Sequence, residues 1–194
     1  SNFFTHRARG NAALSVSIST LSTLGALVFT PLNVGFWASL DPQMNAHAVA
    51  GASLCKRIGH LDHKPPNPGM PDAEYRFAFT GTSSSNLAVG TNLPGSVHSY
   101  MDDSDPTNVD RVGHRRPCLN PGMRKTGFGK DGAFSAMWSF DESRTRVPEY
   151  EFVCYPPRGF TPVRYFGAGH AFSVHLNPTK FRAPDVTTID VSVT

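Results

Sequence analysis

The sequence has few charged residues and few cysteines. Charged side chains make up 17% of the 194 residues, against about 25% in typical globular proteins. This composition favours strands over solvent-facing helices. The three cysteines, Cys55, Cys118 and Cys154, lie far apart and are odd in number, which argues against a disulfide framework and against a CxxC metal site. We therefore expect reduced thiols and a place of assembly inside the cell.

Long apolar runs are also missing. No stretch reaches the roughly 18 apolar residues that a membrane span needs. The longest apolar region, residues 21–40, is interrupted by Gly25, Pro31, Asn33 and Gly35. The basic residues near the start are not followed by an uninterrupted apolar core, so no signal peptide is expected. The sequence therefore predicts a chain without membrane contact.

Glycine, proline and phenylalanine are abundant instead. The 17 glycines and 16 prolines indicate many turns, and 14 phenylalanines supply much of the apolar bulk. Apolar and polar residues alternate in several short segments, which is the period of a half-buried strand. Strands are expected over residues 12–20, 25–30, 34–40, 74–80, 96–101, 133–140, 149–155, 170–176 and 186–194.

One segment has the signals of a helix. Asp41 suits the N-cap, Pro42 suits the first helical position, and the Ala-rich residues 43–57 follow, ending with Lys56 and Arg57. Together these features predict an all-β fold, an antiparallel β-sandwich of jelly-roll type with one short inserted helix and long loops. We expect residues 1–10 to form an N-terminal arm and residues 11–194 to form a single domain.

The same alternation predicts the core. In a strand, every second side chain points to the same face, so the apolar member of each alternating pair is expected to be buried. The side chains expected to be mostly buried are Phe77, Phe79, Phe134, Trp138, Phe152, Phe172, Val174, Ile189 and Val191.

Basic residues concentrate in the arm and in the long loop over residues 102–131. Arginine side chains bind phosphates and carboxylates, so this distribution makes nucleic acid a candidate partner. A solvated surface is the alternative for the loop, and the arm lacks a dense run of Arg and Lys. The expected nucleic-acid contacts are His6, Arg7, Arg9, Arg111, Arg115, Arg116, Arg124 and Lys125.

Three carboxylates follow one of the expected strands within four residues. Asp102, Asp103 and Asp105 repel one another, and an opposing cation would relieve that repulsion. Calcium accepts such hard oxygen ligands with flexible geometry. We expect this cluster to bind Ca²⁺, or a basic group of a neighbouring subunit, while no cofactor is required. The alternative is a solvated turn that begins at Asp105 and Pro106.

The strand pattern resembles the jelly-roll coat proteins of small icosahedral viruses. Residues 27–31 and 34–38 read as two successive coat-protein strands, a helix and long loops separate later strands, and residues 188–194 read as the closing strand. The resemblance implies a structural protein without catalysis. Many copies would assemble in the host cell into a virion, a closed shell around the viral genomic nucleic acid, which could be RNA or DNA.

Two other classes of function stay open. His60 and Asp62 have the HxD spacing of the non-haem iron oxygenases that use a 2-oxoacid, because residues i and i+2 of an extended segment point the same way. The remaining parts of such a site would be a third ligand from His114, His170 or His175 and a 2-oxoacid anchor at Arg182. The other class is a β-sandwich binding module for carbohydrate or protein.

Overall fold

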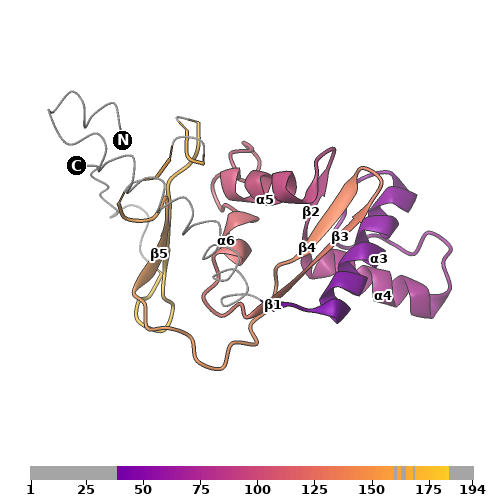
Figure 1. Ribbon diagram of the computed structural model, residues 1–194, viewed down its shortest axis with the longest axis horizontal. Helices are drawn as coiled ribbons and strands as arrows, with labels where there is room; N and C mark the ends of the chain where they lie inside the picture. Colours follow the sequence, from indigo (N-terminus) through magenta and orange to yellow (C-terminus); the bar gives the residue numbers. More distant parts are fainter. Residues whose placement is uncertain (1–38, 160, 163–164, 168, 184–194) are drawn as a thin grey trace, which may run out of the picture. The chain divides into compact units, whose positions relative to one another are not determined.

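The computed structural model describes residues 39–159, 161–162, 165–167 and 169–183 (Figure 1). The chain divides into two units, residues 1–40 and residues 41–194. The features described below belong to the second unit. Its helices are α3 (Pro42–Ile58), α4 (Asp72–Ser83), α5 (Leu93–Asp102) and α6 (Arg115–Cys118). Its strands are β2 (Ser85–Val89), β3 (Lys125–Asp131), β4 (Phe134–Trp138), β5 (Phe152–Tyr155) and β6 (Ser173–Leu176), and β1 (Ser39–Leu40) precedes α3.

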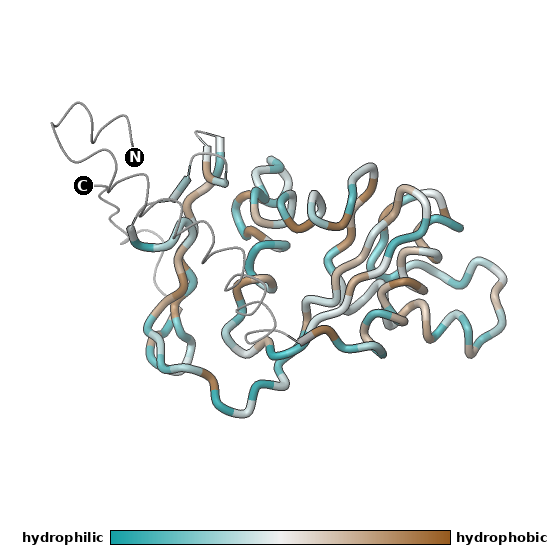
Figure 2. The backbone as a smooth tube through the Cα atoms, in the orientation of Figure 1, coloured by the Kyte–Doolittle hydropathy of each residue, from teal (hydrophilic) through white to brown (hydrophobic). Residues whose placement is uncertain are grey.

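The predicted all-β sandwich is wrong, because helices are major elements of this unit. β4 lies at the centre of an antiparallel sheet, between β2 and β3, with Ala136 opposite both Leu87 and Gly129. β5 and β6 form a separate antiparallel pair, and most residues of β5 itself are hydrophobic (Figure 2). The described residues therefore form an α/β layer structure with an additional hairpin.

Helices cover both faces of the central sheet. On one face, Ala48 and Ala52 of α3 pack against Leu87 and Ala136 of the strands. On the other face, Tyr100 of α5 packs with buried residues of β2 and β4. Because neighbouring strand residues point to opposite faces, Leu87 of β2 lies in one core and the adjacent Ala88 in the other.

The predicted helix is confirmed as α3. The Asp41 carboxylate accepts hydrogen bonds from the backbone N–H groups of Gln43 and Met44, and Pro42 occupies the first turn. Gly59 ends the helix with a left-handed φ of 82°, a conformation that glycine adopts at little cost. Local capping chemistry therefore determines both ends of this helix.

Residues 74–80 were predicted to be a strand but form most of α4. Tyr75 and Phe79 alternate with polar residues, yet they are also four residues apart and therefore share a helix face. Their rings lie 5.7 Å apart. A side chain on Gly81 would collide with the backbone of His47 in α3. The backbones of the two helices therefore lie in direct contact at Gly81. Helix packing decides this segment, because its local pattern fits both periods.

The other predicted strands have mixed outcomes. Residues 96–101 lie in α5, which Asn92 caps by accepting a hydrogen bond from the Gly95 N–H. The strands predicted over 133–140, 149–155 and 170–176 are confirmed in shorter form as β4, β5 and β6. The strands predicted over 12–20, 25–30 and 186–194 lie outside the described residues. The strand predicted over 34–40 also lies outside them, apart from its last two residues.

The predicted aromatic core is confirmed only in part for the described residues. Phe77, Phe172 and Val174 are exposed, with 41%, 67% and 61% of their surface accessible. The other four described residues are mostly buried, as predicted, although none is fully enclosed: Phe79, Phe134, Trp138 and Phe152. Ile189 and Val191 lie outside the described residues. Small residues occupy the helix–sheet interface instead, because the α3 backbone approaches β3 so closely that a side chain on Gly129 would collide with it.

Candidate functional site

A groove of about 840 Å³ lies between the hairpin and the segments around α6 and the end of β4. Pockets of this size hold drug-sized molecules. Most of its wall is apolar. The lining residues are Arg116, Pro117, Leu119, Asn120, Pro121, Ser139, Phe140, Glu142, Tyr150, Val153, Val174, His175, Leu176 and Pro178.

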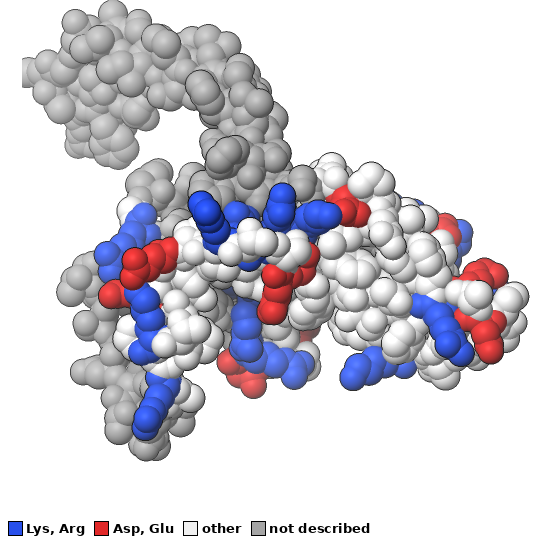
Figure 3. All heavy atoms as spheres, turned by 90° about the horizontal axis from the view of Figure 1, so that it is seen from below, with Lys and Arg blue, Asp and Glu red and all other residues white. Residues whose placement is uncertain are grey.

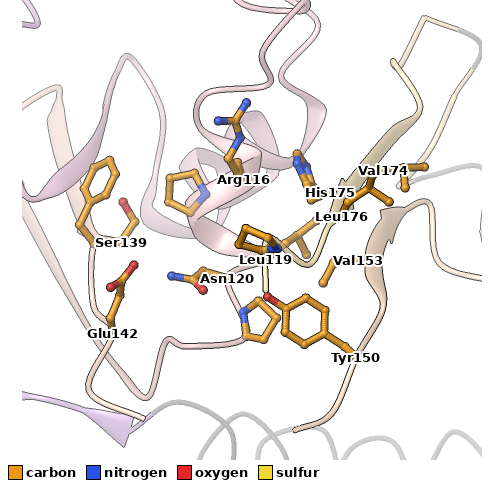
Figure 4. A pocket seen from close by; sticks show the side chains of 14 residues that line it. Arg116, Leu119, Asn120, Ser139, Glu142, Tyr150, Val153, Val174, His175 and Leu176 are labelled. Atoms are coloured by element: carbon orange, nitrogen blue, oxygen red, sulfur yellow. The ribbon is translucent and has the colours of Figure 1, made fainter. Parts of the chain in front are cut away.

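Besides Tyr150, three ionisable side chains stand among these apolar residues. Figure 4 shows Arg116 and His175 on the α6 and β6 sides of the groove, and Glu142 on the opposite side, beside Ser139. The Arg116 guanidinium donates one hydrogen bond, from Nη2 to the Arg111 carbonyl oxygen at 2.8 Å. No described carboxylate forms an ion pair with Arg116.

The His175 imidazole lies in unusual surroundings. It lies on β6 opposite Val153, and its Nε2 atom is buried without a hydrogen-bond partner among the described residues. Burial lowers the pKa of His175, and the positive charges of Arg116 and Arg115 lower it further. The imidazole is therefore neutral at pH 7, in a positive electrostatic field. Buried polar atoms without a partner are rare and call for an explanation, and a binding site is one.

Sequence reasoning missed this groove. Its walls come from residues 116–121, 139–142, 150–153 and 174–178, which no local pattern relates to one another. The one available signal was the alternation over 170–176, but we assigned its apolar face to a core. Val174 instead lines the groove, together with Phe140, and more than half of each side chain is exposed.

Arg115, a predicted nucleic-acid contact, is fully buried. Its guanidinium donates hydrogen bonds to the carbonyl oxygens of Met101, Asp102 and Ala171 and to the Ser173 hydroxyl. The guanidinium also lies over the Tyr155 ring, 4.7 Å from its centroid. Arg115 therefore connects the end of α5 to the hairpin, and no part of it is accessible to a phosphate.

The other predicted nucleic-acid contacts do not converge. Arg111 and Arg116 are exposed neighbours, and Arg124 is exposed elsewhere, whereas Lys125 forms an ion pair with Asp41 at 2.9 Å. On the face shown in Figure 3, Lys and Arg form several groups with Asp and Glu between them. His6, Arg7 and Arg9 lie outside the described residues. The structure thus brings together Arg111 and Arg116 alone among the described members of this set.

The three aspartates of the acidic segment have different surroundings. Asp103 is buried in the left-handed conformation at the end of α5, with φ of 48°. Its Oδ2 atom accepts the backbone N–H groups of His114 and Arg115, each at 3.0 Å. Its Oδ1 atom accepts from His114 Nδ1 at 2.8 Å and from Asn108 Nδ2. These four donors occupy the lone pairs that a cation would need.

The neighbouring aspartates do not join Asp103 in a cluster. Asp102 Oδ1 lies 3.1 Å from His170 Nε2, and Asp105 is exposed and accepts hydrogen bonds from the N–H and hydroxyl of Thr107. Throughout the described ranges, no group of three or more His, Cys, Asp or Glu could hold a metal ion. The Ca²⁺ hypothesis therefore has no ligand set in this part of the chain.

In the part of the chain that the structure describes, the HxD pair also has no third ligand. His60 Nδ1 lies 3.1 Å from the Ile58 carbonyl oxygen, and the Asp62 carboxylate accepts the Lys64 N–H at 2.8 Å. Both contacts are local to the turn after α3. His114 and His170 instead contact the aspartates of α5, and Arg182 is exposed.

Comparison of the chain with family models, curated proteins and solved structures finds no match. Among the described residues, no helix combines the length and the apolar character that crossing a membrane requires. The resemblance to coat proteins depended on a jelly roll, which the described residues do not form. Inference about function therefore starts from the groove.

Proposed function

We propose that this protein binds a small, largely apolar molecule in the groove between α6 and the β5–β6 hairpin. The observation that supports this proposal is the combination of about 840 Å³ of space, mostly apolar walls and a few polar groups. Binding sites for small molecules have this composition, because apolar contacts supply affinity while isolated polar groups orient the ligand.

Exposed apolar side chains on the groove walls agree with this proposal. Phe140 and Val174 are 55% and 61% exposed, and both face the groove rather than one of the two cores. A ligand seated between them would remove this surface from water, which contributes about 25 cal/mol per Å² of apolar area. The perturbed pKa of His175 is a second feature that is common at functional sites.

A neutral apolar fluorophore, N-phenyl-1-naphthylamine, tests the proposal directly. We expect saturable binding with an increase in fluorescence. Phe140→Asn should weaken binding by about tenfold or more, because it removes a large apolar wall. The matched control is Phe77→Asn, which changes a partly exposed phenylalanine of α4 outside the groove and should leave binding unchanged. Equal binding by both variants, or no saturable binding, would contradict the proposal.

Assembly into a shell around nucleic acid stays a prediction of the sequence pattern alone. Light scattering after size-exclusion chromatography, with absorbance at both ultraviolet maxima, tests it. A very large particle that contains nucleic acid would support the shell, and a particle near the chain mass of 21.1 kDa would not.

A further inference from the structure

We infer that the ligand of this groove is an organic monoanion, with an apolar body against the groove walls and one acidic group bound by Arg116. This inference rests on the proposed function and adds the chemical class of the ligand. It follows from the charges around the groove and from the unequal way in which they are neutralised.

Arg116 has hydrogen-bonding capacity left over. An arginine carries five N–H donors, and within the described ranges the guanidinium uses one of its groups, on the Arg111 carbonyl oxygen. No described acidic side chain neutralises its charge. A carboxylate or sulfonate can therefore accept charge-assisted hydrogen bonds from the remaining donors, without displacing an existing ion pair.

The surroundings of Arg116 add to the positive field. Both Arg116 and Arg115 lower the pKa of His175, and no acidic group of the described residues opposes them at that position. The field at this end of the groove therefore attracts a negative charge, and the low-polarity walls strengthen the attraction. By contrast, Arg115 itself is not available to a ligand, because it is buried and donates to carbonyl oxygens and to Ser173.

The opposite wall limits the ligand to one charge. Glu142 lines the groove on the side away from His175 (Figure 4). A second negative group placed there would meet a like charge, which disfavours dianions. The apolar residues between the two sides, among them Leu119, Tyr150 and Leu176, suit the hydrocarbon or aromatic part of the molecule.

Two fluorophores that differ in one group provide the test. 8-Anilinonaphthalene-1-sulfonate has the ring system of N-phenyl-1-naphthylamine with an added sulfonate. We expect the sulfonate probe to bind more tightly than the neutral one. Arg116→Gln should lower the affinity for the sulfonate probe on the order of tenfold, since the sulfonate loses a hydrogen bond to a charged group. The same variant should bind the neutral probe with unchanged affinity, and this binding also shows that the variant is folded.

Arg76→Gln is the matched control, because it removes one positive charge from an exposed position on α4, away from the groove. This variant should bind both probes with the affinity of the wild type. Equal affinity of the two probes in the wild type, or equal loss of both in Arg116→Gln, would overturn the monoanion inference and leave the groove intact. Failure of the neutral probe to bind would overturn the proposed function itself, and the inference with it.

Discussion

At the residue scale, Asp103 and Arg115 organise the loop that sequence patterns marked as a ligand site. Asp103 holds the first turn of α6 through two backbone N–H groups, and Arg115 extends from that turn to the carbonyl oxygens that end α5. At the surface, these two charged groups would attract an ion or a phosphate. Here their hydrogen bonds are made to other groups of the same chain. A charged side chain is stable in such a place when its donors or acceptors are all satisfied.

Replacing Asp103 should reveal this structural role. We expect Asp103→Ala to lower the free energy of unfolding by about 3 kcal/mol, because it leaves buried donors without an acceptor. Urea unfolding followed by circular dichroism measures the change. Asp105→Asn is the control and should cost less than about 1 kcal/mol, since the Asp105 carboxylate is exposed and accepts its hydrogen bonds from Thr107. A calcium site would behave differently, and stabilisation of the wild type by Ca²⁺ would contradict this assignment.

Asp141 should make stability depend on pH. Burial raises the pKa of this carboxyl, but hydrogen bonds from the backbone N–H groups of Lys125 and Arg124 and from Ser143 outweigh burial, so the folded pKa lies below the ordinary value. The unfolded state then binds a proton more readily than the folded state. The stabilisation is complete above the unfolded pKa, near pH 4, and is lost as the pH falls through the folded pKa.

Urea unfolding measured at several pH values between neutral pH and pH 3 tests whether the free energy of unfolding falls on acidification. Wild type should lose stability on acidification more steeply than Asp141→Asn, which carries no titratable group at this position. The variant should also be less stable at neutral pH, because a neutral amide oxygen accepts weaker hydrogen bonds from these two N–H groups than a carboxylate does. Parallel pH profiles of the two proteins would argue against a lowered pKa at Asp141.

At the scale of elements, close backbone approach decides how the helices pack on each other and on the sheet. Gly81 of α4 meets the backbone of His47, and Gly129 of β3 meets the backbone of Ala48 and Val49. A glycine in a helix or strand normally costs stability, because the unfolded chain is more flexible. Here that cost is offset by contacts that any side chain would prevent.

Gly81→Ala should therefore destabilise the protein although alanine favours a helix. Its methyl group would meet backbone atoms that cannot rotate away, and overpacking of this kind costs about 1–3 kcal/mol. Gly169→Ala is the control, since no atom lies within 4 Å of the added position. Thermal unfolding of both variants makes the comparison, and equal melting temperatures would contradict the α3–α4 interface described here.

At the scale of the whole unit, the groove depends on the docking of the β5–β6 hairpin. The hairpin supplies Val153, Val174 and His175 to the wall. Arg115 binds it through Ala171 and Ser173, and His170 adds a contact with Asp102. Few buried apolar residues join the hairpin to the sheet, so these polar contacts have a large share in holding the wall in place.

Arg115→Met should consequently affect the hairpin first. Methionine fills part of the space but leaves the carbonyl oxygens of Met101, Asp102 and Ala171 without their donor. Loss of a hydrogen bond to a charged group costs about 1.5–3 kcal/mol. Hydrogen exchange should rise over residues 152–155 and 173–176 while residues 134–138 stay protected. Loss of protection in the central sheet to the same degree would mean that the hairpin is not a separate unit of stability.

Local sequence by itself determined α3, because Asp41, Pro42 and Gly59 act on backbone groups within a few residues of themselves. Alternation also predicted the strands at 134–138, 152–155 and 173–176, but it did not determine them, because an alternating segment of similar length at 74–80 forms a helix. Residues 74–80 and 96–101 were ambiguous, and packing on α3 and on the sheet decided them. The burial of Arg115, the donors around Asp103 and the groove around Arg116 and His175 join residues far apart in the chain. Only tertiary structure brings such groups within the few ångströms over which hydrogen bonds and burial act.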